Sequence, residues 1–251
     1  MYQDYRIKAP FFEFGPKAYL YGEELLELVM AIDRCAQQYD VDVIVDPQPS
    51  DILLLAAHVK RVHVYGQHMD PLPIGRGMGA ILPEALKAAG AVGVLLNHAE
   101  RKLSLETIKQ TIRRADEVGL ATIVCADTIQ EMEAIARMAP NLIVAEPDEL
   151  IGTGKTSSMD YVHESIARIK AINPDILVLQ GAGISNGQDV YTVIRAGAEA
   201  TGSTSGIIKA ANPAAMAEEM ISAVRRAWDE RLAAASGGLC TGLASQATKC
   251  C

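Results

Sequence analysis

The segment ATIVCADTIQEMEAIARMAPNLIVAE, residues 121–146, decides the expected fold. Two apolar runs, residues 121–126 and 142–146, predict buried strands, and residues 128–138 between them have the apolar spacing of an amphipathic helix. A strand, a helix and a second strand joined by short loops form a βαβ unit, in which the two strands are parallel. The segment therefore predicts a parallel sheet covered by helices.

The same alternation runs along the whole chain. Eight βα units in 251 residues favour a closed (β/α)8 TIM barrel of the α/β class over an open doubly wound sheet. The open sheet is also disfavoured because no Gly-x-Gly-x-x-Gly fingerprint follows the first strand. The predicted strands are residues 10–15, 42–46, 61–65, 92–97, 121–126, 142–146, 176–180 and 198–201. The predicted helices are residues 23–38, 50–59, 83–89, 104–118, 128–138, 159–172, 187–196 and 213–232.

The composition fits this architecture. Hydrophobic residues make up 49% of the sequence but aromatic residues only 5%, so we expect a mostly aliphatic core, as buried parallel strands have. No linker interrupts residues 1–235, which we assign to one barrel domain. From residue 236 the side chains are small and aperiodic, and we expect residues 236–251 to form a flexible C-terminal extension.

Charge and targeting signals exclude several classes of protein. The formal charge of −8 argues against a general binder of nucleic acid or of anionic membranes. No apolar run approaches the roughly 18 residues of a membrane span, and the N-terminus lacks the pattern of a signal peptide. The five cysteines are too scattered for a disulfide framework. We therefore expect a cytoplasmic protein with no nucleic-acid or membrane partner.

The motifs predict neither a metal nor a cofactor. His58 and His63 lack a third ligand at metal-binding spacing. The run Gly-Thr-Gly-Lys-Thr at residues 152–156 lacks the first glycine that a nucleotide-binding P-loop requires. The sequence thus favours chemistry carried out by side chains alone.

Five features fall where predicted strands end. Lys17 follows the first strand, His98 follows the fourth, Glu146 ends the sixth, and glycine-rich turns at residues 181–183 and 202–206 follow the last two. In a (β/α)8 barrel these positions lie on the one face that carries active sites. Each feature alone is ordinary for a loop, since loops contain solvated charges and glycines anyway. Together they supply a base, a neutral acid, a cation and backbone N–H groups able to bind phosphate.

The sequences around these features resemble the triosephosphate isomerase family, in its short archaeal-type branch. Residues 94–101, VLLNHAER, resemble the family's histidine segment. Residues 144–156, VAEPDELIGTGKT, resemble its catalytic glutamate and mobile lid, and this motif is the specific one. The resemblance covers about residues 10–230 and includes the third-loop region and two phosphate loops, at residues 67–71, 82–91, 181–185 and 202–206.

The resemblance implies a sugar-phosphate aldose–ketose isomerase that works through an enediolate. Glu146 would be the base that moves a proton between adjacent carbons, His98 a neutral electrophile at the carbonyl oxygen, and Lys17 the nearby cation; this family is itself the established example of that division of roles. Members of the family are oligomers, so a homodimer or homotetramer is expected. The phosphate site of the small phosphorylated sugar would be lined by Ile151, Gly152, Gly183, Thr204 and Ser205.

Several positions depart from the family pattern. The family carries Asn-x-Lys at the first strand: matching its lysine to Lys17 puts Gly15 at the asparagine, whereas matching the next helix puts Glu13 there and loses the lysine. We prefer the match that keeps Lys17. Ala99 stands where a serine usually follows the histidine, and the third loop carries Met78 in place of a threonine. These changes predict the same proton transfer on a different or larger phosphorylated sugar, with room for another carbon beside residue 15.

Two alternatives stay open at this point. A non-catalytic sugar-phosphate-binding protein would keep the phosphate turns while the ammonium of Lys17 points away from Glu146 and His98. A phosphosugar epimerase on the same barrel would need acids on both faces of its substrate or a metal. For that role the sequence offers Glu146 and, as a doubtful second carboxylate, Glu13.

Overall fold

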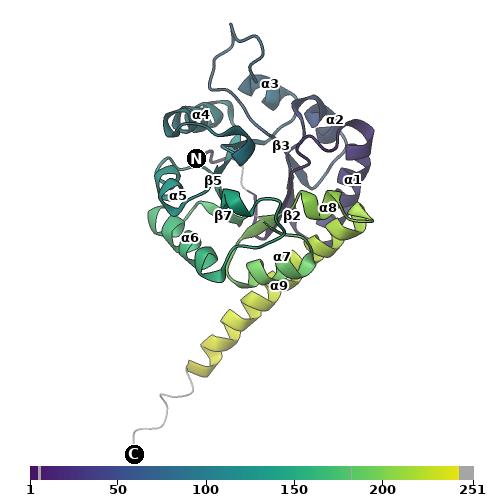
Figure 1. Cartoon of the computed structure of the whole chain (residues 1–251), viewed down its shortest axis with the longest axis vertical. Coiled ribbons are helices and arrows are strands. Elements are labelled where there is room, and N and C mark those ends of the chain that lie inside the picture. The colour runs from purple at the N-terminus through teal and green to yellow at the C-terminus, as the bar shows by residue number, and fades with distance from the viewer. Residues whose placement is uncertain (5–6, 182, 243–251) are drawn as a thin grey trace, which may run out of the picture.

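Eight parallel strands close into a barrel in the computed structural model, which describes residues 1–4, 7–181 and 183–242 (Figure 1). Each strand pairs with the next in the chain, and β1 also pairs with β8, so the sheet has no open edge. The predicted (β/α)8 barrel is therefore confirmed. The strands are β1 Phe11–Phe14, β2 Asp42–Val45, β3 Val62–Gly66, β4 Gly93–Leu96, β5 Ala121–Ala126, β6 Leu142–Ala145, β7 Leu177–Gln180 and β8 Ala200–Gly202.

Helices follow the strands and surround the barrel (Figure 1). All eight predicted helices are present, and the short α8 is an additional turn that the sequence pattern did not predict. The helices are α1 Gly22–Tyr39, α2 Ile52–Ala56, α3 Pro83–Ala88, α4 Leu105–Val118, α5 Ile129–Ala136, α6 Met159–Ile172, α7 Gly187–Arg195, α8 Ser205–Ile208 and α9 Pro213–Gly242. Three 3-10 turns are η1 Pro49–Asp51, η2 Ala99–Arg101 and η3 Asp148–Leu150.

Polar caps fix where several helices begin and end. The hydroxyl of Ser104 accepts a hydrogen bond from the backbone N–H of Thr107 at the start of α4, and Thr128 caps α5 in the same way. Gly119, with φ of 81°, ends α4 in the left-handed region that glycine adopts without strain. Serine and threonine before a helix and glycine after it are typical start and stop signals.

The last helix is longer than predicted. α9 continues to Gly242, past the predicted end at residue 232 and into the segment expected to be a flexible extension. The run Leu-Ala-Ala-Ala at residues 232–235 has strong helix propensity and carries the helix outward. The first part of α9 packs against α1 and α7, while its second half projects from the barrel (Figure 1). The rest of the predicted extension, residues 243–251, lies outside the described residues.

The core consists of two apolar layers, one inside the barrel and one between the barrel and the helices. All three phenylalanines of the chain lie in β1 and are fully buried. Phe11 belongs to the inner layer, whereas Phe12 and Phe14 belong to the outer one. Because side chains alternate along a strand, Glu13 shares the inward face of Phe11 and lies closer to the carboxyl end of β1. No helix within the described residues is both long enough and apolar enough to cross a membrane.

Candidate active site

A cavity of about 600 Å³ opens at the carboxyl ends of the barrel strands. This is the face on which (β/α)8 enzymes carry their active sites. The structure brings all the predicted site residues together in its lining: Lys17, His98, Glu146, Ile151, Gly152, Gly183, Thr204 and Ser205.

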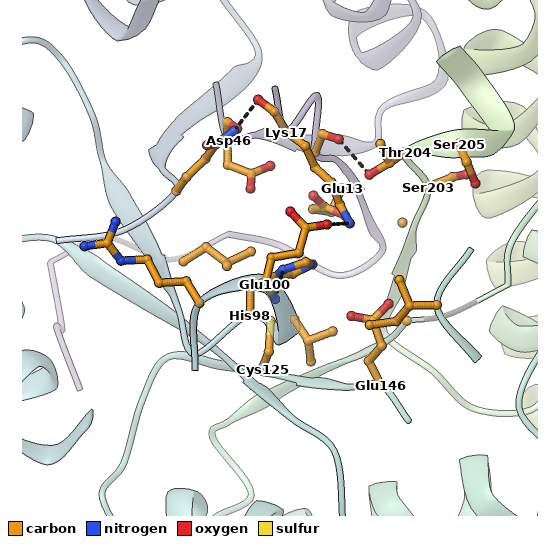
Figure 2. Close-up of a pocket in the computed structure, with 18 of the residues that line it drawn as sticks. Glu13, Lys17, Asp46, His98, Glu100, Cys125, Glu146, Ser203, Thr204 and Ser205 are labelled. Carbon is orange, nitrogen blue, oxygen red and sulfur yellow. Dashed lines mark hydrogen bonds and ion pairs between the residues drawn. The ribbon is translucent and has the colours of Figure 1, made fainter. Parts of the chain in front are cut away.

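Lys17 extends into the cavity from the loop after β1. Its backbone has a left-handed φ of 50°, and its carbonyl accepts hydrogen bonds from Gln48 Nε2 at 3.1 Å and Gln67 Nε2 at 2.9 Å. Its Nζ lies 2.7 Å from Glu100 Oε1. Figure 2 shows this ammonium inside the cavity, between the carboxyl groups of Glu13 and Glu100. The ammonium thus lies in the cavity that His98 and Glu146 also line, whereas the non-catalytic interpretation requires it to point away from them.

His98 is held as a neutral imidazole. It precedes η2, and its Nδ1 accepts a hydrogen bond of 3.1 Å from the backbone N–H of Glu100. A ring nitrogen that accepts carries no proton, so the proton of the neutral ring is on Nε2. Burial and the nearby charge of Lys17 both lower the pKa of His98. His98 can therefore donate a hydrogen bond from Nε2 without being a cation.

Asn97 fixes the turn that carries His98. Its backbone has a left-handed φ of 59°, which asparagine tolerates better than most residues. The side chain is buried and donates to the Cys125 carbonyl at 2.9 Å and to Glu131 Oε1 at 3.0 Å. It also accepts from the backbone N–H of Leu103 at 2.8 Å. Three hydrogen bonds of one buried amide thus anchor the start of η2.

Glu100 is a site residue that the sequence reasoning missed. Its carboxylate pairs with Lys17, its backbone N–H binds His98, and it lines the cavity. The hydrogen bond from Lys17 holds the pKa of Glu100 below its ordinary value. One signal was present, because Glu100 stands two residues after His98 within the segment that resembles the family.

Glu146 follows β6 and lies on the opposite side of the cavity from Glu13 and Asp46 (Figure 2). Its backbone N–H donates to the Ala126 carbonyl at 3.0 Å. A Cβ on Gly181 would lie 3.0 Å from Oε1 of Glu146, so this glycine leaves the space in which the carboxylate lies.

The segment after Glu146 has the anchored ends of a lid. At its start, the backbone N–H of Asp148 donates to Asp127 Oδ1 at 2.9 Å, and the Asp148 carboxylate pairs with Lys102 at 3.0 Å. At its far end, the backbone of Lys155 lies so close to Gly183 that a Cβ on this glycine would overlap the Lys155 carbonyl. The lid thus lies directly against the turn after β7, and it needs glycine at position 183.

Hydrogen bonds to the main chain hold the two phosphate-type turns in place. Ser203 Oγ donates to the Ile184 carbonyl at 2.7 Å and so connects the turn after β8 to the turn after β7. Thr204 Oγ1 donates to the Gly15 carbonyl at 2.6 Å, which connects the same turn to β1. Ser205 begins α8, where the first N–H groups have no acceptor within the helix. Such N–H groups suit the oxygens of a phosphate.

Two carboxyl groups occupy the position beside Gly15. Asp46, which directly follows β2, was not considered from the sequence, and Glu13 was considered only as an alternative match for the family asparagine and as the doubtful second carboxylate of an epimerase. A Cβ on Gly15 would lie 2.8 Å from Glu13 Oε1 and 3.2 Å from Asp46 Oδ1. The room expected beside residue 15 for another substrate carbon is thus filled by these carboxyl groups.

Burial disfavours the ionised form of both carboxyl groups. Burial raises the pKa of Glu13. Burial and the neighbouring Glu13 carboxylate raise the pKa of Asp46 well above its usual range. Two like charges this close cannot both ionise readily, so the pair retains one proton.

Within residues 1–4, 7–181 and 183–242, no group of three or more His, Cys, Asp or Glu side chains is arranged to hold a metal ion.

Comparison with known proteins identifies the family. Residues 16–220 match the family model described as triosephosphate isomerase. A triosephosphate isomerase of Methanobacterium bryantii is 39% identical over 206 residues, which cover 81% of this chain and 91% of that protein. One from Sulfurisphaera tokodaii is 35% identical over 230 residues, covering 90% and 100%. The crystal structure of triosephosphate isomerase from Bartonella henselae shares the fold, with a TM-score of 0.70 at 17% identity, covering 87% of this chain and 99% of that one. The chain belongs to the triosephosphate isomerase family.

Proposed function

We propose that this protein is an aldose–ketose isomerase of a small phosphorylated sugar, with Glu146 as the base, His98 as the electrophile and Lys17 as the cation. The observation that carries the proposal is the meeting of a carboxylate, a neutral imidazole and an ammonium in one cavity beside two phosphate-type turns. The names of the archaeal relatives agree with it.

The substrate phosphate binds at the turns after β7 and β8. Gly183, Thr204 and Ser205 line this end of the cavity, and Ile151 and Gly152 cover it from the lid. Neutral N–H groups are sufficient to bind a phosphate, so the overall charge of −8 does not oppose an anionic substrate.

Isomerisation moves one proton between two adjacent carbons. The Glu146 carboxylate removes the proton from the carbon next to the carbonyl, and the C–H electron pair forms the C=C bond of an enediolate while the carbonyl oxygen gains negative charge. His98 Nε2–H and the Lys17 ammonium stabilise that oxygen as its charge develops. Glu146 then returns the proton to the neighbouring carbon, and the hydroxyl proton transfers to complete the new carbonyl and hydroxyl groups.

The lid protects the intermediate. An enediolate with a phosphate on the next carbon can eliminate that phosphate when it is released or exposed to water. The lid begins directly after Glu146, so its closure and the placement of the base are mechanically connected. An epimerase is not favoured, because the family model and the most similar relatives are named triosephosphate isomerase, which interconverts an aldose and a ketose.

Deuterium exchange tests the proposal. The protein is incubated in D2O with three- to five-carbon ketose phosphates, and incorporation at carbon is followed by NMR. We expect exchange with the wild type and with the matched surface variant Glu164→Gln on α6, and none with Glu146→Gln. Absence of exchange with every phosphorylated sugar by the folded wild type would overturn the proposal.

We also infer that the protein acts in the cytoplasm as a homodimer or homotetramer. The buried free thiols of Cys35 and Cys125 suit a reducing compartment. The loop between β3 and α3 projects from the barrel and exposes Ile74 and Met78, two apolar side chains suited to a subunit contact (Figure 1). Sedimentation velocity is expected to give the mass of a dimer or tetramer, and Met78→Glu to reduce it.

A further inference from the structure

The carboxyl pair of Glu13 and Asp46 lies in a slot shaped for it at the β1–β2 side of the cavity. A Cβ on Gly202 would overlap Glu13 Oε2, and a Cβ on Gly15 would lie 2.8 Å from Glu13 Oε1. Gly15 has no positive φ, so space rather than backbone conformation excludes a side chain at this position. Both glycines therefore serve to accommodate the Glu13 carboxyl.

The pair retains capacity to bind a ligand. Asp46 is only 6% exposed and lines the cavity, and its Oδ1 accepts no hydrogen bond from any N–H group of the described residues. Lys17, the nearest cation in Figure 2, is already paired with Glu100. A buried carboxyl oxygen without a donor is costly. A substrate hydroxyl can act both as donor and as acceptor, so it suits a pair of carboxyl groups that holds one proton.

A triose phosphate has no oxygen left for this pair. Its phosphate occupies the turns after β7 and β8, and its carbonyl and hydroxyl oxygens are those on which His98 and Lys17 act in the proposed mechanism. A sugar phosphate with at least one more carbon has a further hydroxyl. The pair lines the cavity beside Lys17, on the side away from Glu146, so we expect the further hydroxyl of a longer sugar to approach the pair from within the cavity (Figure 2).

We propose that Glu13 and Asp46 form a specificity-determining hydroxyl-binding site that selects phosphorylated sugars of four or more carbons over trioses. The inference rests on the proposed isomerase function of the same cavity. A site built to hydrogen-bond a hydroxyl discriminates strongly against the analogue that lacks it, because the buried polar groups are then left unpaired. The same groups explain why Gly15 stands where the family has asparagine: the carboxyl pair replaces the amide.

The experiment compares kcat/KM for triose, tetrulose and pentulose phosphates. For the wild type we expect at least about a tenfold preference for a substrate of four or five carbons, a threshold well below the roughly 10⁴-fold that a site built for one hydroxyl can reach. Asp46→Asn and Glu13→Gln keep the shape of each group but remove the shared proton, and each is expected to reduce that preference at least about fivefold. The double variant Glu13→Ala/Gly15→Asn, which removes the carboxyl and restores an amide, is expected to shift the preference toward the triose.

Several results would overturn the inference. A wild type that prefers triose phosphate refutes it without any variant, so a variant that fails to fold leaves the test intact. Equal losses of kcat/KM for all substrates in Glu13→Gln and Asp46→Asn would show that the pair only supports the fold. Thermal unfolding of the two variants would then show a loss of stability directly. Exchange with the triose alone would refute the hydroxyl site but keep the isomerase, whereas no exchange with any sugar phosphate would remove both.

Discussion

The two sides of the cavity differ in what they are made of. On the β6–β8 side, Glu146 is followed by a lid that lies against Gly183, and the phosphate turns present backbone groups. On the β1–β2 side, the carboxyl groups of Glu13 and Asp46 lie beside Gly15. Lys17 extends from the loop after β1, where its backbone has a left-handed φ of 50°. The first side carries the family motif, whereas the second departs from it. Under the proposed function, the base and the phosphate turns lie on one side and the hydroxyl-binding pair lies on the other, so the base and the choice of sugar can be altered separately.

The largest effect is expected from removing the base. Glu146→Gln keeps the size of the side chain but cannot accept a proton, and general-base catalysis contributes about 10²–10⁴-fold to rate. We expect kcat to fall by at least about 10³-fold on every sugar phosphate, while inorganic phosphate still binds. Stopped assays of initial rate and phosphate titration measure the two quantities. An equal loss of phosphate affinity would show that Glu146 supports the phosphate turns instead.

The next largest effect is expected at the contact between the lid and the phosphate turn. In Gly183→Ala, the new methyl group would overlap the Lys155 carbonyl, and φ of 72° is itself unfavourable for alanine. Displacement by about 1 Å can cost 10²-fold in rate, and we expect a loss of that order in kcat/KM with all substrates. A matched variant, Gly197→Ala, also has positive φ but its Cβ would lie 3.8 Å from Ile166, so it separates backbone strain from the lid contact. Similar losses of activity in both variants would contradict the assignment.

The residues that the sequence predicts for the β6–β8 side do line one cavity, and they could be named because their sequence features are local. The order of strands and helices follows from apolar periodicity, and Glu146 is contiguous with its lid in one segment. The β1–β2 side was predicted less completely, because its groups meet only through the closure of the barrel. Asp46 is 33 residues away from Glu13 in the sequence, and nothing in either local segment indicates that the two carboxyl groups share one space. Glu100 is an intermediate case. It stands two residues after His98 in the sequence, but it contacts Lys17 only in the folded chain.

Two glycine substitutions compare the sides directly. Gly181→Ala would place a methyl group 3.0 Å from the Glu146 carboxyl, and Gly15→Ala would place one 2.8 Å from that of Glu13. We expect Gly181→Ala to reduce kcat about tenfold for all substrates alike, because the base is displaced. Gly15→Ala is expected to change the ratio of kcat/KM between tetrulose and triose phosphates, with a smaller change in kcat. If both variants altered the same parameter in the same way, the division of roles between the sides would be wrong.

The smallest expected effect concerns the protonation of the His98 ring. An ordinary histidine has a pKa near 6.5, so about three quarters of it is protonated at pH 6. Burial and the charge of Lys17 lower the pKa of His98. We therefore expect its ring to remain mostly neutral at pH 6, with the proton on Nε2, as ¹⁵N NMR of histidine-labelled protein can measure.

The lowered pKa of His98 also affects the stability of the fold. Below pH 6.5 the unfolded chain takes up a proton that the native ring resists, so His98 lowers the free energy of unfolding as the pH falls. Lys17→Met removes the cation and should raise the pKa of His98 toward its ordinary value. A ring that is already cationic at pH 6 in the wild type would refute the role of His98 as a neutral electrophile. It would also refute the proposed connection from Lys17 through Glu100 to His98.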